Sequence, residues 1–180
     1  MLKNDTWIKQ QIARGMITNA ACNFESKGLS RGVSSFGYDV TLGDDIQYFV
    51  GEILDPKYID PMDWVPLRDY GGAVIVPPHS TVLGHSVECF NLPRNITGFV
   101  CPKSTYARCG LICHEAVLEA GWAGQITLAF TNASDVPIVM YKGEGCAQVL
   151  FYSGDDCQES YADRKGKYQN KVGVTFSKVL

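Results

Sequence analysis

The spacing of hydrophobic positions changes once along the chain, and the first 20 residues follow the spacing of a helix. The apolar side chains that share one helical face are Trp7, Ile8, Ile12 and Met16. Asn4 or Asp5 is placed to cap the first turn, and Gly15 stands near its end. The pattern therefore predicts one short amphipathic helix at the N-terminus.

From residue 37 onward, the chain consists of short apolar runs bounded by Gly, Pro, Asn or Asp, which is the pattern of β-strands. These runs cover residues 38–43, 46–50, 73–78, 80–90, 96–102, 125–130 and 137–152. No long helical pattern separates them, so a parallel sheet with crossover helices is excluded. The pattern predicts a mainly β fold, an antiparallel barrel or sandwich.

The first half of residues 160–180 is polar and basic, and in the second half apolar residues alternate with polar ones. A segment with so few apolar residues does not offset the entropy of ordering without a ligand or partner. We expect one domain over residues 1–180, with a C-terminal arm from about residue 160. The alternative is a solvated charged tail, which would have the same polar and basic composition.

Composition and charge exclude several function classes. The chain has 16 basic and 19 acidic residues and a net charge of −3, without a basic run for nucleic acid. No stretch approaches the roughly 20 apolar residues that span a bilayer, and the N-terminus lacks the apolar run of a signal peptide. The seven cysteines form no C-x-x-C pair, which favours free thiols in a reducing, cytoplasmic compartment.

The stretch VCPKSTYARCG, residues 100–110, carries the first candidate chemistry. Pro102 should end a strand, and Lys103, Ser104 and Thr105 would then lie on a turn. A lysine, two hydroxyls and Arg108 within six residues suit an anion or a polar base edge. The alternative is a solvated turn whose arginine pairs with a surface carboxylate.

Five motifs together carry a resemblance to a known family. They are SSFGYDVTLGD (34–44), PKSTYARCG (102–110), LEAGWAG with ITL and FTN (118–132), EGCAQVLFY (144–152) and SYADRKGKYQN with VGVT (160–175). Their order and spacing resemble the dCTP deaminases, which share their fold with trimeric dUTPases. The resemblance covers the chain from about residue 33.

This resemblance implies a distorted β barrel assembled as a homotrimer, with each active site shared between subunits and closed by the arm. The implied reaction converts dCTP to dUTP and ammonia, with Mg²⁺ bound through the triphosphate and dTTP as a possible inhibitor. Zinc deaminases need H-x-E followed by P-C-x-x-C, and the sequence contains neither. His114 with Cys109 and Cys113 lacks a fourth spaced ligand, so we expect no zinc site.

The resemblance also assigns roles to residues 103–108. By similarity, Ser104 positions the attacking water and Arg108 stabilises charge as the tetrahedral centre forms at C4 of cytosine, which suits a hydrolytic deamination. Lys103 resembles a phosphate-binding lysine. The neighbouring Thr105, Tyr106 and Ala107 fall within the same substrate-binding run.

Further positions resemble contacts to the sugar, base and phosphates. Glu119 resembles the carboxylate that accepts a hydrogen bond from the 3′-hydroxyl of the sugar; the alternative is an exposed turn residue. Trp122 resembles the large side chain that excludes a 2′-hydroxyl; the alternative is simple packing in the core. The main chain of Thr127 and Leu128 would recognise the pyrimidine edge. Gln148 resembles a triphosphate contact, or is an outward strand position.

The arm supplies the remaining contacts that the resemblance implies. Tyr161 and Lys167 resemble phosphate-contacting residues, reached when the arm folds over bound nucleotide and excludes water. Where the family pattern has glutamine, this chain has Lys171, which would replace an amide contact by a charged one. Binding should survive that change.

The departure at Ala129 is more serious. The family pattern places a glutamate there as the general base, and losing such a group costs on the order of 10²–10⁴ in rate. Neither Glu115 nor Glu119 obviously replaces it. Either alanine is an engineered substitution in an inactive variant that still binds nucleotide, or the natural protein has lost catalysis; we favour the first, because Ser104, Arg108 and Gln148 are kept together.

Three rival functions remain open at this stage. The chain could be a bifunctional deaminase that also hydrolyses dUTP to dUMP, or a pure dUTPase, although the STYAR run resembles the deaminating branch more closely. From another class, it could be a non-catalytic regulator that binds dCTP or dTTP. The leading hypothesis is a dCTP deaminase that supplies dUTP for thymidylate synthesis.

Overall fold

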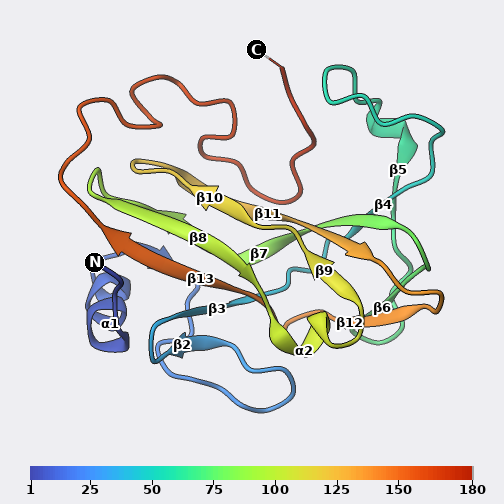
Figure 1. Cartoon of the computed structure of the whole chain (residues 1–180), viewed down its shortest axis with the longest axis horizontal. Coiled ribbons are helices and arrows are strands. Elements are labelled where there is room, and N and C mark those ends of the chain that lie inside the picture. The colour runs from blue at the N-terminus through green and yellow to red at the C-terminus, as the bar shows by residue number, and fades with distance from the viewer. Residues whose placement is uncertain (180) are drawn as a thin grey trace.

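The computed structural model describes residues 1–179 and has the mainly β composition that the sequence predicts (Figure 1). Helix α1 spans Asp5–Ala13 and begins where the Asn4 side chain accepts the N–H of Trp7 at 3.2 Å. It buries Ile8 and Gln11 and ends at Ala13, and Gly15, whose φ is +85°, follows two residues later. The predicted helix is therefore confirmed, but Met16 lies beyond it and packs in the core.

Thirteen strands follow, and every pairing between them is antiparallel in the described residues. In chain order they are β1 Ile17–Thr18, β2 Gly32–Ser34, β3 Gly37–Thr41, β4 Gln47–Phe49, β5 Trp64–Pro66, β6 Ala73–Val76, β7 Thr81–Asn91, β8 Ile96–Pro102, β9 Leu111–Cys113, β10 Ala116–Leu118, β11 Ala123–Asn132, β12 Ile138–Tyr141 and β13 Gly145–Ser153. A 3₁₀ turn, Pro61–Asp63, precedes β5. The helix α2, Ser104–Ala107, replaces the predicted turn after Pro102, which ends β8 as expected.

The strands form three sheets around one core. The first has the order β5-β4-β7-β11-β9, with β1 also on β7; the second is β10-β8-β13-β3-β2; the third is β12-β6. Within residues 1–179 the ladders do not close into a ring, so the expected barrel is an open, distorted one. Its core contains large, fully buried side chains such as Tyr38, Phe90, Phe130 and Phe151.

One carboxylate lies inside this core and joins the first two sheets. Glu88 on β7 is 1% exposed and accepts the Thr41 hydroxyl of β3 at 2.6 Å and the Tyr38 hydroxyl at 3.1 Å. Its other oxygen accepts the Thr41 N–H at 3.0 Å. Burial raises the pKa of this carboxyl, although these three donors favour its charged form.

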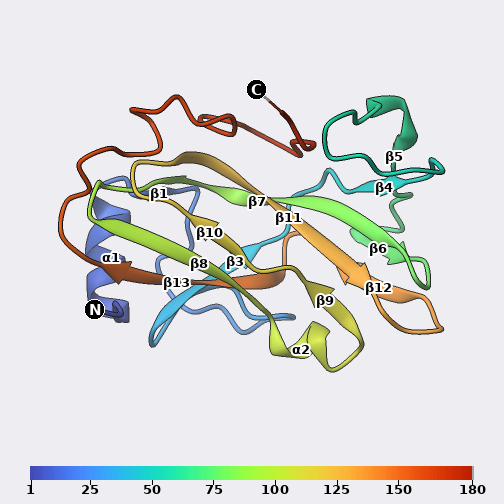
Figure 2. The ribbon, with the colours of Figure 1, turned by 45° about the horizontal axis from the view of Figure 1, so that its top comes forward.

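The C-terminal arm lies along β10 and β11, on the side shown above the sheets in Figures 1 and 2. The C=O of Lys171 accepts the N–H of Gln125 at 2.8 Å, and a parallel bridge joins Lys171 to Gly124. Gly124 has φ +141°, and an added Cβ would lie 2.8 Å from the Lys171 carbonyl oxygen, so this approach requires glycine. The arm thus adds to the edge of β11 that β9 leaves unpaired.

Candidate active site

A cavity of about 670 Å³ lies between the arm, the edge of β11, the β10–β11 connection and the segment before β5. Six of the residues that the sequence singled out line it: Glu119, Trp122, Thr127, Tyr161, Lys167 and Lys171. They come from two segments about 40 residues apart in the chain, which the docked arm brings together. Concave sites of this size are typical of small-molecule binding.

The edge of β11 presents main-chain groups to this cavity. Successive residues of an antiparallel strand direct their main-chain groups to opposite edges, so Thr127 and Ala129 share one edge. At that edge the C=O of Ala129 accepts the N–H of His114, the first residue after β9. The N–H and C=O of Thr127 therefore point past the end of β9, while those of Leu128 point toward β7.

A second group of predicted residues lies around Asp39 of β3. Lys103 is 9% exposed, and its Nζ lies 2.8 Å from Asp39 Oδ2 and 2.9 Å from Ser30 Oγ. Gln148 donates from Nε2 to Asp39 Oδ1 and to Ser34 Oγ, both at 3.1 Å. The predicted lysine and glutamine thus meet one buried carboxylate, so their contacts to phosphate stay a prediction.

Helix α2 displays the residues expected to act on the reacting atoms. Ser104, Thr105, Ala107 and Arg108 are exposed, whereas Tyr106 is buried and accepts the N–H of Tyr141 at 3.0 Å. Tyr106 therefore anchors the helix through its side chain, and burial raises its pKa well above the ordinary value.

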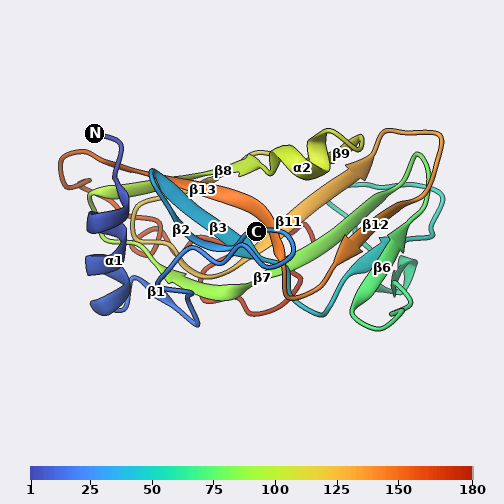
Figure 3. The ribbon, with the colours of Figure 1, turned by 90° about the horizontal axis from the view of Figure 1, so that it is seen from below.

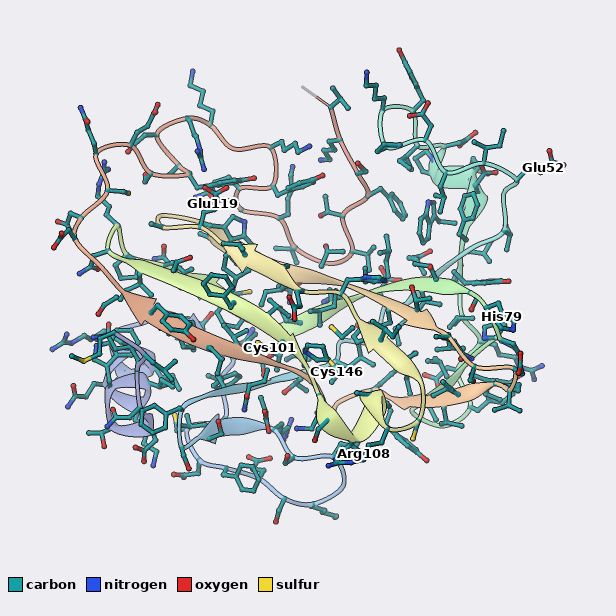
Figure 4. All side chains as sticks on the ribbon, viewed as in Figure 1. Glu52, His79, Cys101, Arg108, Glu119 and Cys146 are labelled. Atoms are coloured by element: carbon teal, nitrogen blue, oxygen red, sulfur yellow. The ribbon has the colours of Figure 1, made fainter. Side chains whose placement is uncertain are left out.

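The residues around α2 and Asp39 lie on a different side of the molecule from the residues that line the cavity. In Figure 1 the arm lies above the sheets and α2 below them, and Figure 3, seen from below, shows α2 standing out between β8 and β9. In Figure 4 Arg108 and Glu119 lie far apart. None of Ser104, Arg108 or Gln148 lines the cavity. In one chain the predicted site residues therefore form two separate groups.

Ala129 is partly buried and is not itself among the residues that line the cavity. Its partner on β7 is Leu83, which lines the cavity, and the register of β11 with β9 places His114 opposite it on the other side. The His114 ring approaches Thr131 Oγ1 through Nε2 at 2.8 Å. Position 129 itself contributes no polar side-chain atom.

Charged contacts hold the beginning of the arm. Asp163 accepts the N–H of Ser160 at 2.8 Å and its hydroxyl at 2.9 Å, and it pairs with Arg94 at 2.8 Å. These donors, the Ser160 N–H first, hold the pKa of Asp163 at about 2. Farther along, Arg164 forms an ion pair with Glu119, and the C=O of Tyr168 accepts the Trp122 Nε1–H at 3.0 Å.

Asp163→Asn is expected to loosen the arm, because the amide keeps an acceptor but loses the ion pair. Trypsin should then cleave after Arg164 and Lys165 faster than in the parent. Since the pKa of Asp163 is depressed, its contribution is present above the unfolded value of about 4 and is lost as pH falls toward about 2. Pepsin digestion of the parent across that range should release the arm.

The matched control for this prediction is Asp135→Asn, which removes a comparable exposed pair, with His79, at the other end of the molecule. It should leave tryptic cleavage of the arm unchanged. Equal protection of the arm in the Asp163 variant and the parent would contradict the anchoring role.

The described residues contain neither a preformed metal site nor a membrane span. Within residues 1–179, no three His, Cys, Asp or Glu side chains are grouped so that they could hold a metal ion. All seven cysteines have free thiols, and burial raises the pKa of Cys113 to about 12. Neither helix of the described part is both long and apolar enough to cross a bilayer.

Comparisons with known proteins agree with the fold and the motifs. A family model described as dCTP deaminase-like matches residues 2–154. A dCTP deaminase of Campylobacter hominis is 42% identical over 99% of this chain and 96% of its own length. A dCTP deaminase of Nitratiruptor sp. is also 42% identical, over 99% of each chain.

The chain belongs to the dCTP deaminase-like family. Among solved structures, the 2′-deoxycytidine 5′-triphosphate deaminase of Agrobacterium tumefaciens has the same fold, with a TM-score of 0.65 and 17% identity over 85% of this chain. This chain spans 48% of that protein's length. A dUTPase of Staphylococcus bacteriophage 80alpha aligns over 78% of this chain with a TM-score of 0.49.

Sequence reasoning missed several residues of this dCTP deaminase-like site. Asp39 lies within the motif SSFGYDVTLGD, but no role was predicted for it. A carboxylate between the apolar residues of YDV indicates that it pairs with a buried polar or charged side chain. The cavity-lining residues Leu54, Pro56 and Ile59 come from a segment with no regular apolar spacing. Leu83 could be found only through the pairing of β7 with β11.

Proposed function

We propose that this chain binds dCTP in the cavity at the edge of β11 and hydrolyses its 4-amino group, giving dUTP and ammonia. The observation that carries the proposal is the main chain of Thr127, directed past the end of β9 beside a cavity lined by Lys167 and Lys171. An N–H and a C=O at one strand edge match the donor and acceptor pattern of cytosine. The product would supply dUMP and dTTP synthesis in the cytoplasm.

In this proposal, the arm binds the triphosphate. Lys167, Lys171 and Tyr161 line the cavity from the arm. Lys167 Nζ donates to the C=O of Lys178 and the Tyr161 hydroxyl accepts the Tyr168 N–H, and both contacts would be exchanged in part for phosphate oxygens. Among the described residues, no three His, Cys, Asp or Glu side chains are grouped to hold a metal ion. In this proposal, phosphate oxygens and water therefore supply most of the Mg²⁺ ligands. When bound, that ion would neutralise phosphate charge, while the lysines orient the nucleotide.

The sugar would lie against Trp122 and Glu119. Trp122 is 7% exposed and fixed through its N–H, so it packs in the core and still forms a rigid cavity wall. Glu119 is paired with Arg164 and would exchange part of that contact for the 3′-hydroxyl. A rigid wall at the sugar is the proposed basis for preferring a deoxyribose.

We infer that Ser104 and Arg108 reach this cavity from another copy of the chain, in a homotrimer. Both are exposed on α2 and remote from the cavity of their own chain. Ser104 would then orient the attacking water, and Arg108 would stabilise the charge that develops during addition at C4. Inhibition by dTTP at the same site follows from the same contacts to sugar and phosphates.

With alanine at position 129, nucleotide binding is kept, but the glutamate that would carry protons during deamination is missing. Either the chain is an inactive variant that still binds nucleotide, or another side chain moves the protons. The rival non-catalytic regulator shares the binding step and lacks the chemistry. A bifunctional enzyme would add release of diphosphate and dUMP.

Calorimetry is expected to show dCTP binding by the chain as it stands, weaker binding of CTP, and a loss on Lys167→Ala of roughly 10-fold for one charged contact. Ala129→Glu should release ammonia from dCTP, because the carboxylate restores a proton carrier at the strand edge. The matched control Ala133→Glu places the same residue at an exposed position after β11. Binding without ammonia from either the parent or Ala129→Glu would replace the proposal by the regulator.

A further inference from the structure

We propose that His114 is the proton-transfer residue of this chain and acts in the space beside Ala129. The inference rests on the proposed deamination of dCTP at the edge of β11. It concerns the group that accepts and returns protons there.

The strand register places His114 next to the proposed base site. Phe130 pairs with Cys113, so the next pair along the ladder is Ala129 with His114, joined by the 2.9 Å bond from the His114 N–H. Side chains of directly opposed residues lie on the same face, with Cβ atoms roughly 5 Å apart. Thr127 is two residues along β11, about 7 Å away.

The cavity extends to the same level of the sheet. Leu83, the other cross-strand partner of Ala129, lines the cavity, and so does Ala116, two residues after His114. Neither Ala129 nor His114 lines the cavity itself, but alanine is small, so no bulky side chain at position 129 stands between the imidazole and the cavity wall at Leu83. A histidine at this place therefore lies beside the site where C4 would be presented.

The contacts of His114 leave one ring nitrogen available. Its Nε2 lies 2.8 Å from Thr131 Oγ1, which in turn lies 3.0 Å from Thr81 Oγ1. When Nε2–H donates to Thr131 and the Thr131 hydroxyl donates to Thr81, Nδ1 carries the lone pair that accepts a proton. This hydroxyl pair orients the ring as a hydrogen-bond partner commonly does for a catalytic imidazole.

Other titratable side chains near Ala129 are committed elsewhere. His85, opposite Thr127, is 8% exposed; its Nδ1 meets the Ser86 C=O at 3.0 Å and its Nε2 lies 3.7 Å from Asp44. Glu115 follows His114 and lies near Cys101, whose pKa is raised by burial first and by the Glu115 charge second. His114 is exposed, and among the described residues its ring forms one hydrogen bond, with the Thr131 hydroxyl.

The proton balance of the reaction needs one group that acts twice. Nδ1 takes a proton from water as the C4–O bond forms and the C4=N3 π electrons move to N3, and the imidazolium returns that proton to N3. Nδ1 then takes the proton of the C4 hydroxyl and gives it to the amino group as C4=O forms and the C4–N bond breaks. Ammonia leaves, and no further reactant is consumed.

The test measures ammonia release from dCTP by the full-length protein and three variants: His114→Gln, Ala129→Glu and the double variant. The parent is expected to turn over, and His114→Gln should lower kcat by about 10²–10⁴ without changing dCTP affinity in calorimetry. Ala129→Glu in the His114→Gln background should restore most of the lost rate. Unchanged dCTP binding shows that the variants are folded.

The matched control is His79→Asn, at an exposed histidine before β7 that pairs with Asp135 and makes no contact with the His114 ring in the described residues (Figure 4). Residue 79 has φ +51°, a conformation that asparagine also adopts, and its substitution should leave kcat unchanged. Turnover by Ala129→Glu but not by the parent, or full activity of His114→Gln, would overturn the role of His114 and leave the proposed function standing. No turnover by the parent, Ala129→Glu or the double variant would end both.

Discussion

Co-expressed Arg108→Ala and Lys167→Ala chains are expected to recover activity that each variant lacks alone. Arg108 lies on α2 and Lys167 lines the cavity, and these parts lie apart in one chain. An intact site would need its α2 from a Lys167→Ala chain and its cavity from an Arg108→Ala chain. In a random, equal mixture each choice has a probability of about one half, so roughly a quarter of the sites should be intact. The recovered ammonia release should approach that fraction.

Arg108→Ala should be severely impaired, and Lys167→Ala should lose roughly 10-fold in rate when dCTP is well below saturation. Removing a donor that stabilises developing charge costs about 10²–10³ in kcat, which is the loss expected for Arg108→Ala. Both substitutions are made in the Ala129→Glu chain, so that the result does not depend on how the parent moves protons. Ammonia release by the mixture is then compared with the Ala129→Glu parent at equal total protein.

The matched control mixes Arg108→Ala with Ser104→Ala. Both residues belong to the α2 part of the site, so every α2 in that mixture lacks one of them and activity should stay low. Recovery in this control, or no recovery in the first mixture, would contradict a site shared between subunits.

The longer elements of the fold follow from local sequence pattern, because seven or more residues show their spacing clearly. The runs at 80–90, 96–102 and 125–130 became β7, β8 and the central part of β11. The three-residue strands β9 and β10 contain too few positions to show alternation and were not predicted, whereas β4 lies within the predicted run 46–50. The places of β9 and β10 depend on pairing with longer neighbours.

The candidate site was predictable where its residues form local motifs. Tyr161, Lys167 and Trp122 were named from the sequence, and the docked arm brings them to one cavity. Contacts over long sequence separations were not predictable: Lys103 meets Asp39, 64 residues earlier, although it was expected on an outward-facing turn. The position of His114 opposite Ala129 likewise depends on strand register, which spacing alone does not provide.

Glu88→Ala is expected to lower the free energy of unfolding by about 2–4 kcal/mol. Glu88 accepts bonds from the Thr41 hydroxyl and N–H and from the Tyr38 hydroxyl, and it is almost completely buried. Alanine leaves a cavity and three donors without their acceptor. Urea unfolding at fixed protein concentration and pH 7 measures the change.

Glu88→Gln separates the hydrogen bonds from the charge, because the amide preserves the shape and cannot ionise. Burial raises the pKa of Glu88, so the folded state binds the proton more tightly than the unfolded state. That stabilisation is fully present below the unfolded value of about 4.3 and is lost as pH rises through the folded pKa. The Gln variant should therefore gain stability relative to the parent between pH 4 and pH 8, whereas the exposed control Glu52→Gln should follow the parent (Figure 4). A difference between Glu88→Gln and the parent that stays constant with pH would contradict a buried carboxyl with a raised pKa.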